Sequence, residues 1–274
     1  MASLLLHINE RLGWKMNEAA FKSVSLTDRV VVVTGAGKGI GAAASELFAA
    51  RGAKVVLADI DETAVAEVAA KIRLAGGEVD YRRTDVSLED DVKELINFAI
   101  NRFGGLHGAF NNAGRIGTGT PLIDITESEW SQSIGVNQTS IFYCMKYEIA
   151  HMLEHGGGSI VNTSSGNGIV GGLNIVDYAA AKHAVVGMTR AAAADYSSKG
   201  IRVNVLLPGA VMTPMLMRAF EQMPENKEVC ERGHPIGRLG QPSEIAEAAA
   251  WLLSDAASFV TGAYLAVDGG FTAI

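Results

Sequence analysis

Hydrophobic runs and amphipathic stretches alternate along the chain from about residue 27 onward. Residues 30–34 form a continuous run rich in β-branched side chains, which is typical of a strand buried on both faces of a parallel sheet. Residues 54–59 repeat this character, and residues 62–74 then show helical spacing that stops before Gly76 and Gly77. The pattern therefore indicates strands that are connected by helices.

The same alternation continues to the end of the chain. Further strands are predicted at 79–83, 108–111, 158–163, 202–207 and 263–267, and further helices at 88–103, 127–154, 177–199 and 242–253. Thr126 is expected to cap the helix that begins at residue 127. Strands separated by helices pair in parallel through right-handed crossovers. We therefore predict an α/β fold with one Rossmann-type domain at 27–274: a doubly wound, parallel, seven-stranded sheet with helices on both faces and its ligand site beyond the carboxyl ends of the strands.

Residues 1–26 precede the repeating pattern and are expected to form a lead-in of uncertain order. Met16 is an alternative natural start, and the sequence does not choose between the two. The apolar segment at residues 4–6 is far shorter than the ~20 residues that span a bilayer, and it lacks the basic start of a secretory signal. No membrane association is expected.

The composition narrows the possible partners. The 274 residues fit one large domain, and the formal net charge of -7 argues against a nucleic-acid partner. Cys144 and Cys230 are far apart, which predicts no disulfide framework and favours a reducing cytoplasm. His151 and His155 are one helical turn apart, but no carboxylate motif accompanies them, so we expect a solvated helix end and no metal site.

A glycine-rich segment follows the first predicted strand and opens a helix; it reads Thr34-Gly35-Ala36-Gly37-Lys38-Gly39-Ile40-Gly41. Glycines allow a tight turn that approaches a pyrophosphate closely, and a helix N-terminus offers free amides to that anion. Ile40 stands where the commoner Gly-x-Gly-x-x-Gly pattern has its last glycine. Because the segment follows a buried strand, we favour a dinucleotide site over a purely structural turn.

Asp59 ends the second predicted strand, 18 residues beyond Gly41. A carboxylate at this place accepts hydrogen bonds from ribose hydroxyls and repels a 2′-phosphate, so it favours NAD over NADP. Two alternatives stay open: Asp59 can be a turn or capping residue before Asp61, and the ammonium of Lys38 can meet a 2′-phosphate. We predict NAD, with NADP possible.

Tyr178 and Lys182 are four residues apart in a predicted helix, so both project from one face. A free phenol titrates near ~10, and an adjacent cation is expected to lower its pKa toward the working range of a general base. The Tyr-x-x-x-Lys spacing arises often by chance. Here it is supported by the upstream glycine-rich turn, by a serine at position 165 and by the segment at 111–114.

Taken together, these segments resemble the short-chain dehydrogenase/reductase family over residues 26–274. The matching pieces are residues 34–41, Asp85-Val86, Asn111-Asn112-Ala113-Gly114, Ser165, Tyr178 with Lys182, and Pro208-Gly209. The resemblance implies that Ser165 bonds the substrate oxygen, that Tyr178 exchanges a proton with it, and that Lys182 holds the nicotinamide ribose and lowers the Tyr178 pKa. It also implies that Asn137 supports the lysine through an ordered water. Ser164 is the alternative to Ser165.

The resemblance further implies a set of cofactor contacts. Asp85 and Val86 would contact the adenine, Asn111 and Gly114 would border the adenosine, and Thr213 would bond the nicotinamide carboxamide. The segment 111–114 can otherwise be a plain turn. The cofactor-binding set predicted is Gly35, Lys38, Gly39, Ile40, Gly41, Asp59, Asp85, Val86, Asn112, Ala113, Gly114, Tyr178, Lys182, Pro208, Gly209, Val211 and Thr213.

The segment after Pro208 is rich in methionine and is predicted to form a substrate lid at about 210–236, although ordinary core packing is the alternative. Its apolar residues are Met212, Met215, Leu216, Met217, Phe220 and Met223. Residues 171–176 are expected to form the facing wall, with Arg115 and Ile116 nearby. Such a pocket suits a hydrophobic secondary alcohol or its ketone.

Segments at 144–147, 234–238, 251–262 and 268–273 are similar to those of the bacterial cyclic-alcohol and cyclic-diol dehydrogenases within this family. They imply an NAD(H)-dependent oxidoreductase that interconverts a cyclic secondary alcohol or diol and its ketone, assembled as a homotetramer. One alternative is an NADP(H)-dependent 3-oxoacyl thioester reductase, which Arg115, Arg218 and Lys227 allow and Asp59 disfavours. The other is a dinucleotide-binding protein without catalysis, which would be expected to lack the serine, tyrosine or lysine.

Overall fold

The computed structural model describes residues 24–222 and 225–274, and its centre is one sheet of seven strands that pair in parallel in the order β3-β2-β1-β4-β5-β6-β7. The strands are β1 (Val30–Thr34), β2 (Lys54–Asp59), β3 (Val79–Arg83), β4 (Gly108–Asn111), β5 (Gly158–Thr163), β6 (Ile201–Pro208) and β7 (Tyr264–Val267). The predicted doubly wound sheet is therefore confirmed. The predicted lead-in at 1–26, with Met16, lies mostly outside the described residues.

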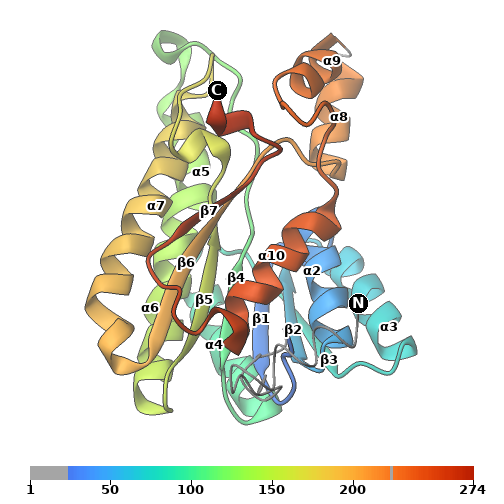
Figure 1. Cartoon of the computed structure of the whole chain (residues 1–274), viewed down its shortest axis with the longest axis vertical. Coiled ribbons are helices and arrows are strands. Elements are labelled where there is room, and N and C mark those ends of the chain that lie inside the picture. Colours follow the sequence, from blue (N-terminus) through green and yellow to red (C-terminus); the bar gives the residue numbers. More distant parts are fainter. Residues whose placement is uncertain (1–23, 223–224) are drawn as a thin grey trace, which may run out of the picture.

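Helices cover both faces of the sheet (Figure 1). One layer contains α2 (Gly39–Ala50), α3 (Glu62–Leu74) and α10 (Pro242–Leu253), and the other contains α4 (Glu89–Phe103), α5 (Glu127–Ile134), α6 (Ser140–Glu154) and α7 (Val176–Tyr196). Short 3-10 turns lie at η2 (Leu122–Asp124), η4 (Gly166–Gly168), η5 (Ser197–Lys199), η6 (Asp255–Ala257) and η7 (Phe271–Ala273). Among the helices of the described residues, none is long and apolar enough to span a membrane.

The burial pattern of β1 explains why two layers of helices form. Val31 and Val33 belong to a buried cluster with Phe48 of α2, whereas Val32 belongs to a second cluster with Leu95 of α4. Successive side chains of a strand point to opposite faces, so a run of apolar residues requires cover on both. The continuous hydrophobic runs seen in the sequence are satisfied in this way.

The predicted helix at 127–154 is divided. Its beginning is as expected: the Thr126 hydroxyl accepts from the Glu129 amide at 3.2 Å, and the Glu129 carboxylate accepts from the Thr126 amide at 2.9 Å. However, α5 passes into a π-helical turn, η3 (Gly135–Thr139), before α6 begins. A π-turn inserts an extra residue into the helix, and such turns occur frequently at functional sites.

The segment after β6 contains two helices that the sequence pattern did not predict, α8 (Pro214–Gln222) and α9 (Glu225–Arg232). They stand beyond the carboxyl ends of the strands, at the upper right of Figure 1. In the sheet, β1 lies between β2 and β4. After β2 the chain continues into α3 on one face of the sheet, and after β4 it continues toward α5 on the other face. Ligands of doubly wound sheets bind at this kind of switch point.

Candidate active site

The turn between β1 and α2 can exist only with glycine at its key positions. Gly35 has φ +65°, and a Cβ added to it would lie 2.9 Å from the Cα of Ala113. A Cβ on Gly41 would lie 2.1 Å from the carbonyl oxygen of Gly35. The helix α2 begins with no side-chain cap and no acidic residue in its first turn. Its amides and helix dipole therefore suit an anion such as a pyrophosphate, so the residues present fit a dinucleotide.

Thr34 holds this turn against the end of β4, and sequence reasoning did not single it out. Its hydroxyl oxygen accepts hydrogen bonds from the amides of Asn112 at 3.0 Å and Ala113 at 3.1 Å. The Asn112 side-chain amide donates back to the Thr34 carbonyl at 3.1 Å. Asn112 and Ala113 were predicted to bind cofactor, and the structure places them directly behind the glycine turn. The sequence feature that could have identified Thr34 is a hydroxyl-bearing residue at the end of a buried strand.

The adenosine end of the expected site holds a carboxylate beside an ion pair. Asp59 accepts from the amide of Gly37 at 2.8 Å and from the amide of Asp61 at 3.0 Å. The cap of α3 is Asp61, which accepts from the amide of Ala64 at 3.1 Å. Asp61 also pairs with the Lys38 ammonium at 2.6 Å. Asp61 and not Asp59 therefore caps α3, and the Asp61 carboxylate balances the charge of Lys38.

The two predicted adenine contacts lie just beyond β3. The Asp85 carboxylate accepts from the amide of Ser87 at 3.0 Å and from its hydroxyl at 2.6 Å. Val86 is buried in a small cluster with Val92 and Cys144. The Asp85 side chain thus shapes the loop, while Val86 contributes apolar packing under it.

The two candidate serines differ in what their hydroxyls bond. Ser164 is buried, and its hydroxyl donates to the main-chain carbonyl of Lys182 at 2.7 Å. Ser165 accepts from the amide of Asn167 at 3.2 Å, and its hydroxyl is close enough to the Tyr178 phenol to lower the pKa of that phenol. Ser165 therefore faces the tyrosine, whereas Ser164 is occupied in joining β5 to α7.

The expected lowering of the Tyr178 pKa by Lys182 is wrong for the chain itself. Burial raises the pKa of Tyr178 above its ordinary value, and the hydrogen bond with Ser165 opposes this rise. The Lys182 ammonium lies 5.6 Å from the Tyr178 ring centroid and donates instead to the Thr163 carbonyl at 3.0 Å. Lys182 is itself 3% exposed, and burial lowers its pKa to about 8. Removal of water around the phenol thus outweighs the opposing effect of the Ser165 hydroxyl.

Asn137 lies at the centre of the π-turn and is fully buried. Its side-chain oxygen accepts from the amide of Arg115 at 3.0 Å, and its side-chain nitrogen donates to Ser133 at 3.4 Å. A Cβ built on Gly114 would lie 3.2 Å from the Asn137 oxygen and 3.6 Å from the Lys182 nitrogen. The structure therefore brings Asn137 close to Lys182 through the space above Gly114.

The turn after β6 is held by His234, which sequence reasoning did not assign to the site. Its Nε2 accepts from the amide of Ala210 at 2.9 Å, so its Nδ1 donates to the Cys230 carbonyl at 2.6 Å. A Cβ on Gly209 would lie 2.6 Å from the same Nε2. His234 thus joins the end of the predicted lid to the Pro208-Gly209 turn.

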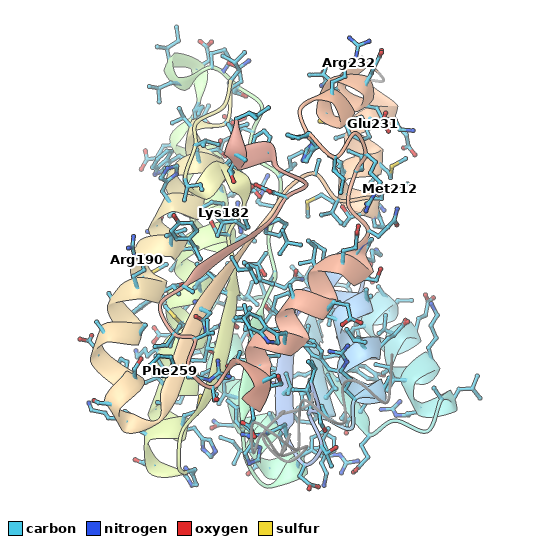
Figure 2. The ribbon with its side chains drawn as sticks, viewed as in Figure 1. Lys182, Arg190, Met212, Glu231, Arg232 and Phe259 are labelled. Carbon is cyan, nitrogen blue, oxygen red and sulfur yellow. The ribbon has the colours of Figure 1, made fainter. Side chains whose placement is uncertain are left out.

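Thr213 brings the predicted lid over the glycine-rich turn. A Cβ on Gly39 would lie 2.9 Å from the Thr213 methyl group, so the two segments are in close contact. The Thr213 hydroxyl accepts from the Leu216 amide at 3.3 Å, and its own amide donates to the Val211 carbonyl at 2.7 Å. In Figure 2, Met212 of this segment and Lys182 of α7 lie on different sides of the upper half of the molecule.

The sequence left two roles open for the apolar residues after Pro208, a substrate lid or core packing, and the structure shows some of each. Met212 and Met215 are exposed, as a lid residue would be, whereas Phe220 is buried like a core residue. On the other side, Ile116 and Leu173 are exposed. Met223 lies outside the described residues.

The sequence offered two histidines for a metal site and two cysteines for a disulfide, and the structure shows how each pair is arranged. The rings of His151 and His155 stack at 4.0 Å, and no group of three metal-ligating side chains among the described residues is arranged to hold an ion. Cys144 and Cys230 are both free.

Comparison with known proteins identifies the family. Residues 35–272 match a family model described as enoyl-(acyl carrier protein) reductase. The chain is 53% identical over 251 residues to a 2,5-dichloro-2,5-cyclohexadiene-1,4-diol dehydrogenase of Sphingobium indicum, covering 91% of this chain and 99% of that protein. It is 43% identical to a cyclohexanol dehydrogenase of Acinetobacter sp., covering 91% and 97%.

A solved structure gives the same result. It is described as a candidate NAD(P)-dependent gluconate 5-dehydrogenase of Beutenbergia cavernae with bound NADP at low occupancy. It is 35% identical and superposes with a TM-score of 0.86 over 92% of this chain and 99% of that chain. The fold, the order of the site residues and these similarities agree. The chain belongs to the short-chain dehydrogenase/reductase family of oxidoreductases.

Proposed function

We propose that this chain is an NAD(H)-dependent oxidoreductase that interconverts a hydrophobic cyclic secondary alcohol or diol and its ketone. The observation that carries the proposal is the meeting of Ser165, Tyr178 and Lys182 at the carboxyl edge of the sheet. The Ser165 hydroxyl faces the Tyr178 phenol and lowers its pKa, and the lysine lies buried one helical turn from the tyrosine.

When bound, the nicotinamide ring supplies the hydride acceptor or donor. The chain's own residues bind, orient and move the proton. Ser165 donates a hydrogen bond to the substrate oxygen, and Tyr178 takes the hydroxyl proton during oxidation and returns it during reduction. Lys182 holds the ribose hydroxyls, and Asn137 stands beside it above Gly114.

The preference for NAD rests on the charges around Asp59. Its carboxylate lies against the glycine turn, where it repels a 2′-phosphate. Lys38, the residue that favoured NADP, is paired with Asp61. The structural relative that holds NADP has only 35% identity, so family membership alone does not decide the cofactor.

The substrate class rests on the apolar side chains around the site and on the relatives. Ile116, Leu173, Met212 and Met215 are exposed near the carboxyl edge, and they suit a hydrophobic ring better than a charged group. The Arg115 guanidinium, which an acyl-carrier substrate would use, instead donates to Gln132 at 3.0 Å. Relatives that act on a cyclic diol and on cyclohexanol point the same way.

The direct test is turnover of cyclohexanol and cyclic diols with NAD and with NADP, in wild type and in Tyr178→Phe. Removing the phenol should lower kcat by roughly 10²–10⁴, the usual size of a general acid–base contribution, while NAD binding is retained. Near-normal turnover by the variant would eliminate the assignment. Reduction of a 3-oxoacyl thioester with NADPH, and no activity on cyclic alcohols, would establish the competing reductase instead.

We also propose a cytoplasmic homotetramer. Large apolar side chains stay exposed on two regions, Trp130, Phe142 and Leu153 on α5 and α6, and Phe259, Tyr264 and Ile274 near the chain end. Contacts between copies would bury both regions. Sedimentation at micromolar concentration should give four times the chain mass, and a purely monomeric species would contradict the proposal.

A further inference from the structure

Asp177 is a buried carboxylate that the proposed chemistry does not use. It lies in the first turn of α7, next to Tyr178, and is 0% exposed. Among the ion pairs of the described residues, none includes it. A buried charge without a cation is unfavourable unless hydrogen bonds satisfy it. Its bonding partners therefore indicate what the residue does.

The partners of Asp177 lie 59 residues away, in the segment after β4. The amide of Thr118 donates to one carboxylate oxygen at 3.1 Å, and the Thr118 hydroxyl donates to the other at 3.4 Å. Capping of its own helix is a different pattern, in which the side chain accepts from amides two or three residues on.

The segment that Asp177 holds packs against the first turn of α7, at Tyr178. A Cβ on Gly117 would lie 2.9 Å from the Cβ of Tyr178 and 3.1 Å from the Asp177 carboxylate. At its beginning, the Arg115 amide donates to Asn137. Residues 115–118 are thus fixed at one end by Asn137 and at the other by Asp177.

Ile116 lies between these two anchors and is 50% exposed. The segment keeps its place against Tyr178 only while both anchors persist, because the glycine at position 117 would otherwise allow many conformations. The position of Ile116 therefore depends on the carboxylate.

From this geometry we propose that Asp177 is a positioning residue for substrate. It fixes residues 115–118 as one wall of the alcohol site, with the exposed side chain of Ile116 as the apolar part of that wall. The role sets the KM for a cyclic alcohol and leaves cofactor binding unchanged. The inference rests on the proposed function.

The test compares Asp177→Ala with Asp177→Asn, with Asp195→Ala as a control, since Asp195 is exposed on the same helix. Steady-state rates are measured with cyclohexanol varied at saturating NAD, together with NAD affinity and the melting temperature of each variant. Losing both bonds in Asp177→Ala should raise the KM by about tenfold or more, with kcat changed less than about threefold. Asp177→Asn should stay near wild type, because an amide can accept from the Thr118 amide and donate to its hydroxyl.

Thr118 provides a second, milder perturbation if Asp177→Ala does not fold. Thr118→Val removes the hydroxyl that donates to Asp177 and accepts from the Thr120 amide, and it should raise the KM by about threefold, while Thr118→Ser keeps both bonds and should not. An unchanged KM in folded Asp177→Ala, or equal losses in the alanine and asparagine variants, would overturn the inference and leave the proposed function intact. A wild-type protein that oxidises no cyclic alcohol would overturn both.

Discussion

Glu148 carries a proton in the folded chain that it releases on unfolding. Its side chain is fully buried in α6, where one oxygen accepts from the Asn111 side-chain amide at 3.0 Å and the other has no hydrogen-bond partner among the described residues. Burial raises its pKa from 4.5 to about 8, and the bond from Asn111 only partly opposes the rise. The neutral form is favoured because no cation is placed to balance the charge.

The pKa shift makes the stability of the chain depend on pH. Since the folded pKa is raised, the full contribution of Glu148 is present below the unfolded pKa of 4.5 and is lost as the pH rises to about 8. Each pH unit in this window lowers the free energy of unfolding by about 1.4 kcal/mol. At pH 7 the titration of Glu148 has therefore lowered the free energy of unfolding by about 3 kcal/mol relative to its value below pH 4.5.

Glu148→Gln keeps the shape of the side chain and remains neutral at every pH. Its stability relative to wild type should therefore increase by about 4 kcal/mol between pH 5 and pH 8. Urea unfolding at several pH values measures this change, with Glu154→Gln, an exposed site at the end of the same helix, as control. If the difference in unfolding free energy between Glu148→Gln and wild type stays constant with pH, within about 0.5 kcal/mol, the conclusion that Glu148 is protonated in the folded chain is refuted.

Three further predictions concern the cofactor side. Asp59→Ser should raise kcat/KM with NADP relative to NAD by at least about tenfold, because it removes a like-charge repulsion of roughly 1–4 kcal/mol; an unchanged ratio would contradict the assignment. His234→Ala should raise the KM for NAD by about tenfold by freeing the Ala210 amide, and His234→Gln should restore it. Gly41→Ala should abolish NAD binding in calorimetry, whereas Gly187→Ala, whose added Cβ meets no atom within 4 Å, should leave it unchanged.

Features that depend on neighbouring residues could be predicted from the sequence. The hydrophobic run of β1 indicated a strand covered on both faces, and its position before the glycine-rich turn indicated the dinucleotide edge of the sheet. The spacing of Tyr178 and Lys182 placed both on one helix face. Short-range geometry of this kind depends on helix and strand periods, which the residues themselves determine.

Other features arise only when distant segments meet. Thr34 bonds residues 78 and 79 positions away, and Asp177 bonds Thr118 across 59 positions, so neither partner could be identified before the sheet order was known. The π-turn at Asn137 depends on packing against α7 and on the Arg115 amide, and local helix propensity alone predicts an ordinary helix there.

The pKa of Tyr178 shows the difference most clearly. The sequence identified the lysine one turn away and so predicted a lowered pKa, but the fold removes water from the half-buried phenol and directs the ammonium to the Thr163 carbonyl. Chain order determined which groups share a helix face. The tertiary structure decided their solvation and hydrogen bonds, and these control proton affinity because removing water from a group disfavours its charged form.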